Sequence, residues 1–268
     1  MISRVLSVTV VLFWLVSMGW LVHHDIIPRW TARDAPRYAP GDWLTERLRS
    51  SQVRIEDAHN HRVGTAWSVY ASSAGRLSRR DVLVLTRFPM LGPVRIVAES
   101  DFTPQGALDA FHLDVFGVGK PVTLVGEQYS GQFAFQLKIG SLPFQYFKVD
   151  ARVCAMLGDA LRPFSALPNL EVGQSWRMQV INPVAVVSGI GAKTLPTVVR
   201  VTGRESIAHA GGREACFVVR ADRVTAWVSD DGLVLRQRIE SPWGGTFDVI
   251  DEPFDQSALD RALNGPLK

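Results

Sequence analysis

Cysteine is nearly absent from this chain of 268 residues, which holds only Cys154 and Cys216. With no Cys-x-x-Cys pair and no zinc-like spacing, the two cysteines argue against a structural metal site. An oxidising compartment would permit a single disulfide between them. The alternative is two free thiols that pack as small apolar side chains in a core.

Several catalytic motifs are also missing. The sequence has no Gly-x-Ser-x-Gly and no phosphate-binding loop, and the stretch that ends in Lys193-Thr194 has the wrong spacing for one. A cysteine nucleophile needs a neighbouring base, and the residues near Cys154, Asp150 and Arg152, supply none. Cys216 lies in a strand-like segment. We therefore predict a protein that is not an enzyme, with no catalytic residue and no cofactor.

Charge is modest and evenly spread. Charged residues make up 21% of the chain, the formal net charge is +3, and the basic residues form no run. This pattern gives no support to a nucleic-acid partner. The hydrophobic content of 47% is ordinary for a chain that buries a core.

Residues 5–22 carry no charge and are long enough to cross a bilayer as a helix. A cleavable signal peptide would be followed by a small-x-small cleavage site, and the sequence after residue 22 offers none. We predict an uncleaved single-pass anchor over residues 1–24, with the membrane as its partner. Three arginines after the span favour a cytoplasmic body, but long domains translocate largely regardless of this bias. We expect the body on the periplasmic side of a bacterial inner membrane.

A proline-bearing stalk is predicted over residues 25–50, where Pro28, Pro36 and Pro40 break any helix. From about residue 51 apolar and polar residues alternate, which is typical of half-buried strands. A first β module is predicted over 51–150, with strands at 81–88, 94–102, 107–116, 121–130 and 131–140. The short turns between these strands predict a meander of hairpins, and long strands in a meander coil into a half-barrel or barrel-like sheet.

Residues 151–172 interrupt this alternation with helical spacing of apolar residues, which predicts a short helix and a loop. A second β module is predicted over 173–255, with strands at 174–183, 197–208, 213–222, 224–230, 233–241 and 246–252. The tail, 256–268, is compatible with a short amphipathic helix. The predicted fold class is mainly β: a transmembrane helix, then curved antiparallel β-meander sheets that can be continuous across the two modules, and one short helix.

Three stretches of the second half resemble a group of uncharacterised bacterial envelope β-proteins: LPNLEVGQSWRMQVINP, VTGRESIAHAGGREACFVVRAD and AWVSDDGLVLRQRIE. In the first half, VRIVAESDFTPQGALDAFHLDV resembles β domains that precede transglutaminase-like domains. Sheets related in style, wrapped around a helix, occur in Lol-type lipoprotein carriers. The resemblance to these carriers implies, by analogy of fold, an apolar concavity that takes acyl chains, and it implies no catalytic residue.

Two segments are candidate sites. If the backbone is extended, Asp57, His59 and His61 share one face and could hold zinc or iron, and the alternative is a polar hairpin edge. Asp230 and Asp231 could be paired carboxylates, but a catalytic pair needs opposed and partly buried positions. Because a glycine follows them, we interpret these two acids as a tight turn. The strand after this turn is predicted to carry a basic outer stripe of Arg236 and Arg238 and an apolar inner face.

The eight tryptophans and 13 phenylalanines offer a further interpretation, because one face of each alternating strand is apolar. That face either packs as a core or lines a pocket for a lipid. The leading hypothesis is a membrane-anchored, non-enzymatic binding or accessory module for a lipid, a lipoprotein or a membrane complex. The alternatives are a structural domain that partners a transporter or a transglutaminase-like protein, and a metal-dependent enzyme that uses residues 57–61.

Overall fold

The computed structural model describes residues 17–18, 49–73, 76–87, 92–104, 108–117, 119–150, 167, 169–181, 194–209, 212–240 and 245–266. The predicted anchor lies outside this part of the chain except for residues 17–18, which are helical. Among the described residues, no helix has both the length and the apolar character that crossing a membrane requires. The helix predicted within 151–172 also lies outside the described residues.

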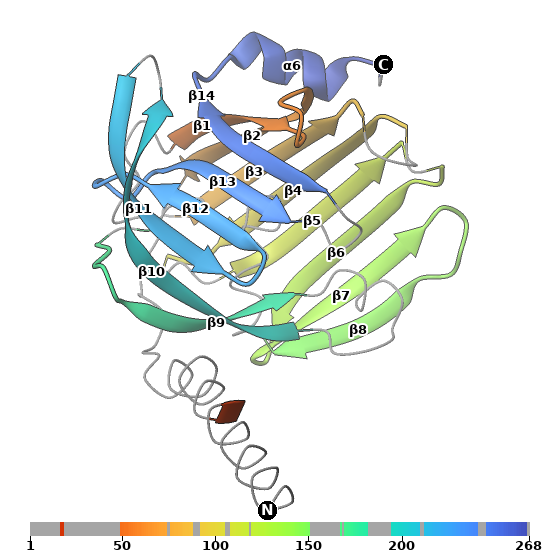
Figure 1. Cartoon of the computed structure of the whole chain (residues 1–268). Helices are drawn as coiled ribbons and strands as arrows, with labels where there is room; N and C mark the ends of the chain where they lie inside the picture. The colour runs from red at the N-terminus through yellow and green to blue at the C-terminus, as the bar shows by residue number, and fades with distance from the viewer. Residues whose placement is uncertain are drawn as a thin grey trace, which may run out of the picture.

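The body is a single antiparallel sheet of 14 strands (Figure 1). Its first eight strands are β1 (Ser50–Glu56), β2 (Arg62–Ser73), β3 (Arg76–Leu85), β4 (Val94–Phe102), β5 (Leu108–Phe116), β6 (Val122–Tyr129), β7 (Gln132–Ile139) and β8 (Gln145–Asp150). The other six are β9 (Ser175–Ile181), β10 (Thr194–His209), β11 (Gly212–Ala221), β12 (Val224–Val228), β13 (Val234–Glu240) and β14 (Thr246–Glu252). One helix, α6 (Gln256–Asn264), follows the last strand.

The strand order shows two meanders joined at a seam. Strands β1 to β8 run in sequence toward one edge of the sheet, and β14 to β9 run toward the other. The first and last strands of the body, β1 and β14, pair in the middle with Val53 opposite Asp251. The prediction that two sets of hairpins share one continuous sheet is therefore confirmed. The sheet is not closed, and β8 and β9 are its edge strands.

Figure 1 shows the sheet curving so that β9–β13 lie in front of β4–β7. Side chains alternate between the two faces of such a sheet. The inner face, on the inside of the curve, carries Val53, Ala66, Leu83 and Val249, which form one buried apolar cluster across the seam. The outer face carries the intervening side chains. Apolar inner faces of this extent are what drive the strands to curl together, since burial of each large side chain contributes about 1.5–3 kcal/mol.

Helix α6 covers part of the outer face. Its Leu259 packs against Trp67 of β2 and Val82 of β3. Asp255 caps the helix, accepting a hydrogen bond from the backbone N–H of Ala258 at 3.0 Å. At the other end, the Arg95 guanidinium donates to three final carbonyl oxygens, those of residues 262, 263 and 265, at 3.0–3.1 Å. The amphipathic helix predicted within 256–268 is confirmed.

The predicted strands are found, with boundaries that differ in places. The predictions for 94–102 and 246–252 match β4 and β14. Strand β3 starts at residue 76 rather than 81. No strand was predicted where β1, β2 and β8 lie, although β1 and β2 fall in the predicted first β module. A register shift beside Phe102 places Leu108 in the inner cluster with Phe111, whereas uninterrupted alternation put the two on opposite faces.

A second bulge, beside Trp227, changes the faces of β13. Val234 joins the inner cluster, while Leu235 packs beside Cys216 and Trp227 in a separate cluster. Alternation along 233–241 would place Leu235 on the apolar inner face with Ile239, and the structure shows that this placement is wrong. One extra residue in a strand reverses the alternation on one side of it.

Candidate ligand-binding site on the inner face

A charged pair lies on the inner face of β3, where the neighbouring side chains are mostly apolar. The Nε atom of Arg79 lies 2.8 Å from one carboxylate oxygen of Asp81 and donates a hydrogen bond to the other at 2.9 Å. The Ser68 hydroxyl, on β2, donates to the same carboxylate. The side chains of Arg79 and Asp81 are only 2% and 3% exposed. A pair buried this deeply adds little net stability, although the loss of either partner is costly.

Two further side chains adjoin this pair across the neighbouring strands. The register places Tyr70 opposite Arg79 on one side and Ser100 opposite Arg79 on the other. The guanidinium carbon of Arg79 lies 5.3 Å from the centre of the Tyr70 ring, which is a cation–π contact. We refer to Ser68, Tyr70, Arg79, Asp81 and Ser100 as the inner polar cluster.

Ser100 is a member of the inner polar cluster that carries an unused hydrogen-bonding group. It is 1% exposed, and its hydroxyl oxygen has no hydrogen-bond partner in the described structure. A buried hydroxyl without a partner costs free energy, so a group that enters beside Ser100 and completes this hydrogen bond gains that energy.

The inner face of β4 to β7 carries an aromatic cluster, which consists of Phe102, Phe111, Phe133 and Phe135 together with Leu108. The Phe133 and Phe135 ring centres are 4.9 Å apart. Gly126 on β6 leaves room for both rings, because a Cβ atom at this position would meet them at 2.5 and 2.6 Å. A glycine inside the strand thus leaves the space that the Phe133 and Phe135 rings occupy.

The inner polar cluster and the aromatic cluster adjoin each other. Ser100 stands opposite Arg79 on one side and opposite Phe111 on the other. Ala98, next to Ser100 on the same face of β4, belongs to the aromatic cluster and stands opposite Asp81. The inner face therefore changes from ionic and hydroxylic to aromatic within one strand spacing of about 5 Å. This arrangement fits a molecule with a polar head and an apolar chain.

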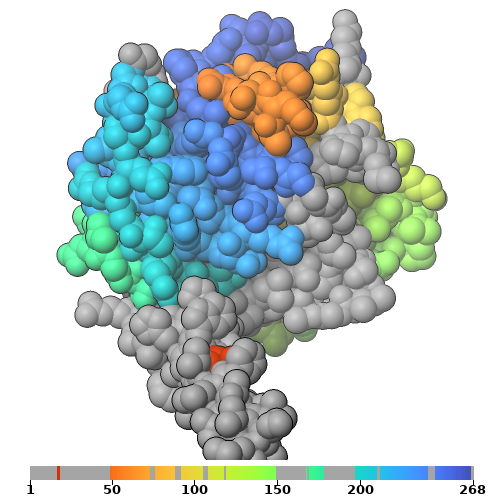
Figure 2. All heavy atoms as spheres, in the orientation of Figure 1, coloured from red at the N-terminus to blue at the C-terminus, as the bar shows by residue number. Residues whose placement is uncertain are grey.

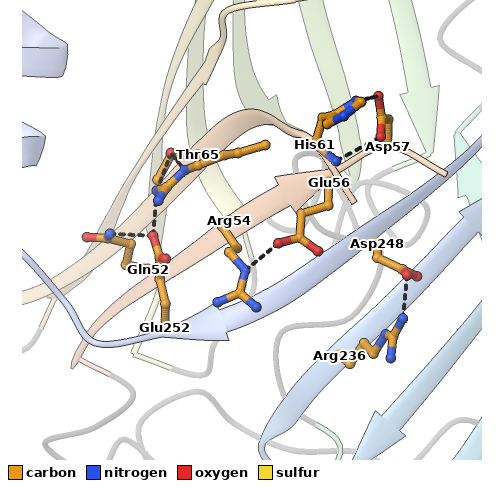
Figure 3. Close-up of polar contacts among 10 residues, drawn as sticks. Gln52, Arg54, Glu56, Asp57, His61, Thr65, Arg236, Asp248 and Glu252 are labelled. Atoms are coloured by element: carbon orange, nitrogen blue, oxygen red, sulfur yellow. Dashed lines mark hydrogen bonds and ion pairs between the residues drawn. The ribbon is translucent and has the colours of Figure 1, made fainter. Parts of the chain in front are cut away.

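At the seam between β1 and β14, the outer face carries charged and polar side chains that pair with one another across the strands. Figure 3 shows side chains of β1, β2, β13 and β14 joined by short contacts along this face. Glu252 accepts hydrogen bonds from Gln52 at 2.6 Å and from Arg62 at 2.7 Å. Arg236 and Arg238 both donate to Asp248. In Figure 2, the cyan-to-blue atoms of β10–β14 form a continuous outer surface beside the orange residues of the first strands.

Two arginines determine the ionisation of Asp248. Burial alone would raise the pKa of this carboxyl, but the hydrogen bonds and positive charges of Arg238 and Arg236 outweigh burial, and the pKa is lowered. Both guanidinium groups also lie over the Trp227 ring: the distance from the Cζ atom to the ring centre is 5.4 Å for Arg236 and 5.9 Å for Arg238. The predicted basic outer stripe is present; Asp248 offsets part of its charge, and the Trp227 ring covers part of it.

The predicted metal candidate is a turn rather than an extended segment. Residues 57–61 join β1 to β2, and Asn60 has a positive φ of 60°. One oxygen of Asp57 accepts the backbone N–H groups of His59 and His61 at 2.8 and 3.0 Å (the turn at the upper right of Figure 3). These hydrogen bonds hold the pKa of Asp57 below its ordinary value. The described residues contain no group of three His, Cys, Asp or Glu side chains placed to hold a metal ion.

Asp230 and Asp231 form the predicted tight turn, with Gly232 at a φ of 85°. Asp230 pairs with Arg204, and Asp231 accepts a hydrogen bond from the Ser229 hydroxyl. Because the two carboxylates turn to different partners, they do not form the opposed pair that acid–base catalysis needs. The prediction of a tight turn at these two acids is confirmed.

Cys216 is a buried free thiol. Burial, and after it the charges of Glu214 and Asp230, raise its pKa to about 11. Such a thiol is protonated at neutral pH and is a poor nucleophile. Cys154 and Lys193 lie outside the described residues. Thr194 opens β10 and so belongs to a strand rather than to a phosphate-binding loop.

Reasoning from the sequence missed the inner polar cluster. The predicted strand began at Asp81, so Arg79 was left in the preceding turn. One signal was available: Leu77, Arg79, Asp81 and Leu83 are spaced two residues apart, so in a strand the two charged residues share a face with the two leucines. Ser100 gave no signal, because a serine in an alternating strand is common on either face.

No family model matches this sequence, and neither the curated proteins nor the solved structures contain a significant match to it. The geometry of the inner face is therefore what supports a function.

Proposed function

We propose that this protein is a non-enzymatic module that binds a lipid-like amphiphile on the inner face of its sheet. The polar head of the ligand contacts the inner polar cluster, where the Ser100 hydroxyl donates or accepts a hydrogen bond. The apolar chain packs against the aromatic cluster of β4 to β7. The observation that carries this proposal is that β4 places a buried ionic cluster beside a buried aromatic surface on one face of the sheet.

The electrostatics of the inner polar cluster favour a head group that is zwitterionic or uncharged. Arg79 and Asp81 neutralise each other at hydrogen-bond distance. A ligand that brought a full unpaired charge into this buried face would lose its hydration without a matching counter-charge. A hydroxyl, ester or amide head can instead complete the hydrogen bond of Ser100 at little electrostatic cost.

The cellular setting belongs to the same proposal. Residues 5–22 anchor the protein in a bacterial inner membrane, with the sheet on the periplasmic side, so the lipid ligand comes from the envelope. The resemblance to envelope β-proteins and to Lol-type carriers, given by the stretches quoted above, is consistent with this setting.

Ligand uptake tests the proposal directly. The full-length protein is purified in detergent, stripped of bound lipid, and titrated with a fluorescent fatty acid and a fluorescent monoacylglycerol. We expect saturable uptake of the monoacylglycerol at one site. Ser100→Ala removes one hydrogen bond, and we expect its affinity to fall roughly fivefold, which corresponds to about 1 kcal/mol.

Ser78→Ala is the matched control, because Ser78 lies on the outer face of β3 and its hydroxyl donates only to the carbonyl of Ala71. This variant is expected to bind as the parent does. Uptake of neither probe would show that the inner face is only a core. Uptake that Ser100→Ala leaves unchanged would place the ligand elsewhere and overturn the proposed site.

A further inference from the structure

The loop between β7 and β8 and the start of β8 carry three large exposed apolar side chains at one edge of the sheet (Figure 1). Leu142 is 48% exposed, Phe144 49% and Tyr146 70%. The ring centres of Phe144 and Tyr146 are 6.5 Å apart, so the two rings form one surface. Together these three side chains are called the edge apolar patch. Apolar side chains gathered at such exposure mark an interaction surface.

Lysines surround the edge apolar patch. The ammonium group of Lys138 lies 5.4 Å from the centre of the Phe144 ring. Lys120 lies over Gly140, where a Cβ atom would meet its side chain at 3.0–3.3 Å. Lys148 follows Tyr146 by two residues on the same face of β8. All three lysines are exposed.

The distribution of charge in this region differs from that of the rest of the chain. The whole sequence has five lysines, and three of them are at this edge; no arginine occurs between Arg95 and Arg152. No acidic residue stands between Glu127 and Asp150. Glu127 itself lies two strands from Lys148, across Ala134. The edge is therefore locally cationic, although the chain as a whole carries a formal charge of only +3.

Aromatic and aliphatic side chains ringed by lysines are the composition of a surface that enters a lipid interface. Tyrosine and phenylalanine rings pack at the level of the head groups. Lysine stems lie along the apolar surface while the ammonium groups reach the phosphates. Each lysine near an anionic surface contributes roughly fivefold to partitioning.

We infer that the edge apolar patch, with Lys120, Lys138 and Lys148, docks on the surface of an anionic bilayer. This inference is independent of the proposed ligand site, which lies on the inner face of the sheet. It orients the β7–β8 edge of the sheet toward the membrane.

Hydrogen exchange in the full-length protein tests the docking. The protein is reconstituted in nanodiscs of phosphatidylcholine alone or of phosphatidylcholine with phosphatidylglycerol. Exchange is followed at the backbone amides of residues 141–147 by mass spectrometry. We expect exchange at least several-fold slower in the anionic discs. The triple variant K120Q/K138Q/K148Q is expected to exchange at the same rate in both kinds of disc. The double variant Leu142→Ser/Phe144→Ser is expected to lose the protection of residues 141–147 in both.

Tyr129→Ser is the matched control. Tyr129 is 77% exposed at the β6–β7 turn, at the opposite end of β7 from the patch. We expect it to change neither exchange at 141–147 nor the preference for anionic discs. Equal exchange in both lipids would overturn the inference. Protection that disappears when the discs are diluted would also overturn it, because the edge strand β8 would then be contacting a second copy of the chain. Unchanged thermal unfolding of each variant shows that the fold is kept.

Discussion

Two arginine–aspartate clusters lie on opposite faces of the same sheet, and they differ in their access to water. Arg79 and Asp81 on the inner face are 2% and 3% exposed. On the outer face, Asp248 is 9% exposed, but its partners Arg236 and Arg238 are 31% and 45% exposed. The outer arginines keep much of their hydration, so their pairing costs little. The inner pair gives up its hydration, and an apolar pair of similar size would stabilise the sheet as well or better. The difference predicts that breaking the inner pair lowers the free energy of unfolding more than breaking the outer one.

Breaking the inner pair is expected to give the largest effect. Asp81→Ala leaves the Arg79 guanidinium in an apolar face without its carboxylate, and we expect the free energy of unfolding to fall by about 3–5 kcal/mol. Unfolding by heat or denaturant of the full-length protein in detergent measures it. The double variant R79M/D81L replaces both charges with apolar side chains and is expected to recover most of the loss. If Asp81→Ala were as stable as the parent, water would have to reach the Arg79–Asp81 pair.

The aromatic half of the inner face is expected to be nearly as sensitive. Gly126→Ala places a Cβ atom within 2.5–2.6 Å of the Phe133 and Phe135 rings, which must move in a packed core. We expect the free energy of unfolding to fall by about 1–3 kcal/mol. Gly203→Ala is the control, since nothing lies within 4 Å of a Cβ atom there. Equal effects of the two substitutions in thermal unfolding would show that the rings are loosely packed.

On the outer face, Asp248→Asn is expected to cost about 1–2 kcal/mol at pH 7, because three partly exposed charge-assisted hydrogen bonds from two arginines are weakened. The pKa of Asp248 is lowered below its ordinary value of 3.8. Its contribution is therefore complete above that value and is lost as the pH falls through the lower pKa of the folded state. The stability difference between parent and variant should shrink below pH 4 in a pH series of unfolding curves. A difference that stays constant down to pH 2 would contradict this assignment.

The smallest expected effect concerns Cys216, which belongs to neither cluster. Because its pKa is raised to about 11 and it is buried, it should resist alkylation by iodoacetamide at pH 8 in the folded protein. Peptide mass spectrometry reads the modification at this residue alone, and the unfolded protein provides the positive control. Rapid alkylation in the folded state would show that this part of the sheet opens.

Much of the fold could be predicted from the sequence because alternation is a local signal. The strands predicted at Val94 to Phe102 and at Thr246 to Glu252 have the bounds that the structure shows. The faces of Leu108 and Leu235 could not be predicted, because a bulge is decided by the pairing of two strands rather than by either one. The turn at 57–61 was open to two interpretations for a similar reason. An aspartate can bind a metal or cap its own backbone, and here it accepts two N–H groups.

By itself, the sequence determined a mainly β body of short-turned hairpins, the turn at Asp230 to Gly232 and the absence of recognised catalytic motifs. These properties depend on residue type and spacing, which act over a few positions. Only the tertiary structure decided that β1 pairs with β14, so that two meanders become one curved sheet. It alone brought Ser68, Arg79 and Ser100 together from three strands beside the aromatic cluster. Contacts between residues far apart in the chain follow from strand order and register, and no local pattern specifies them.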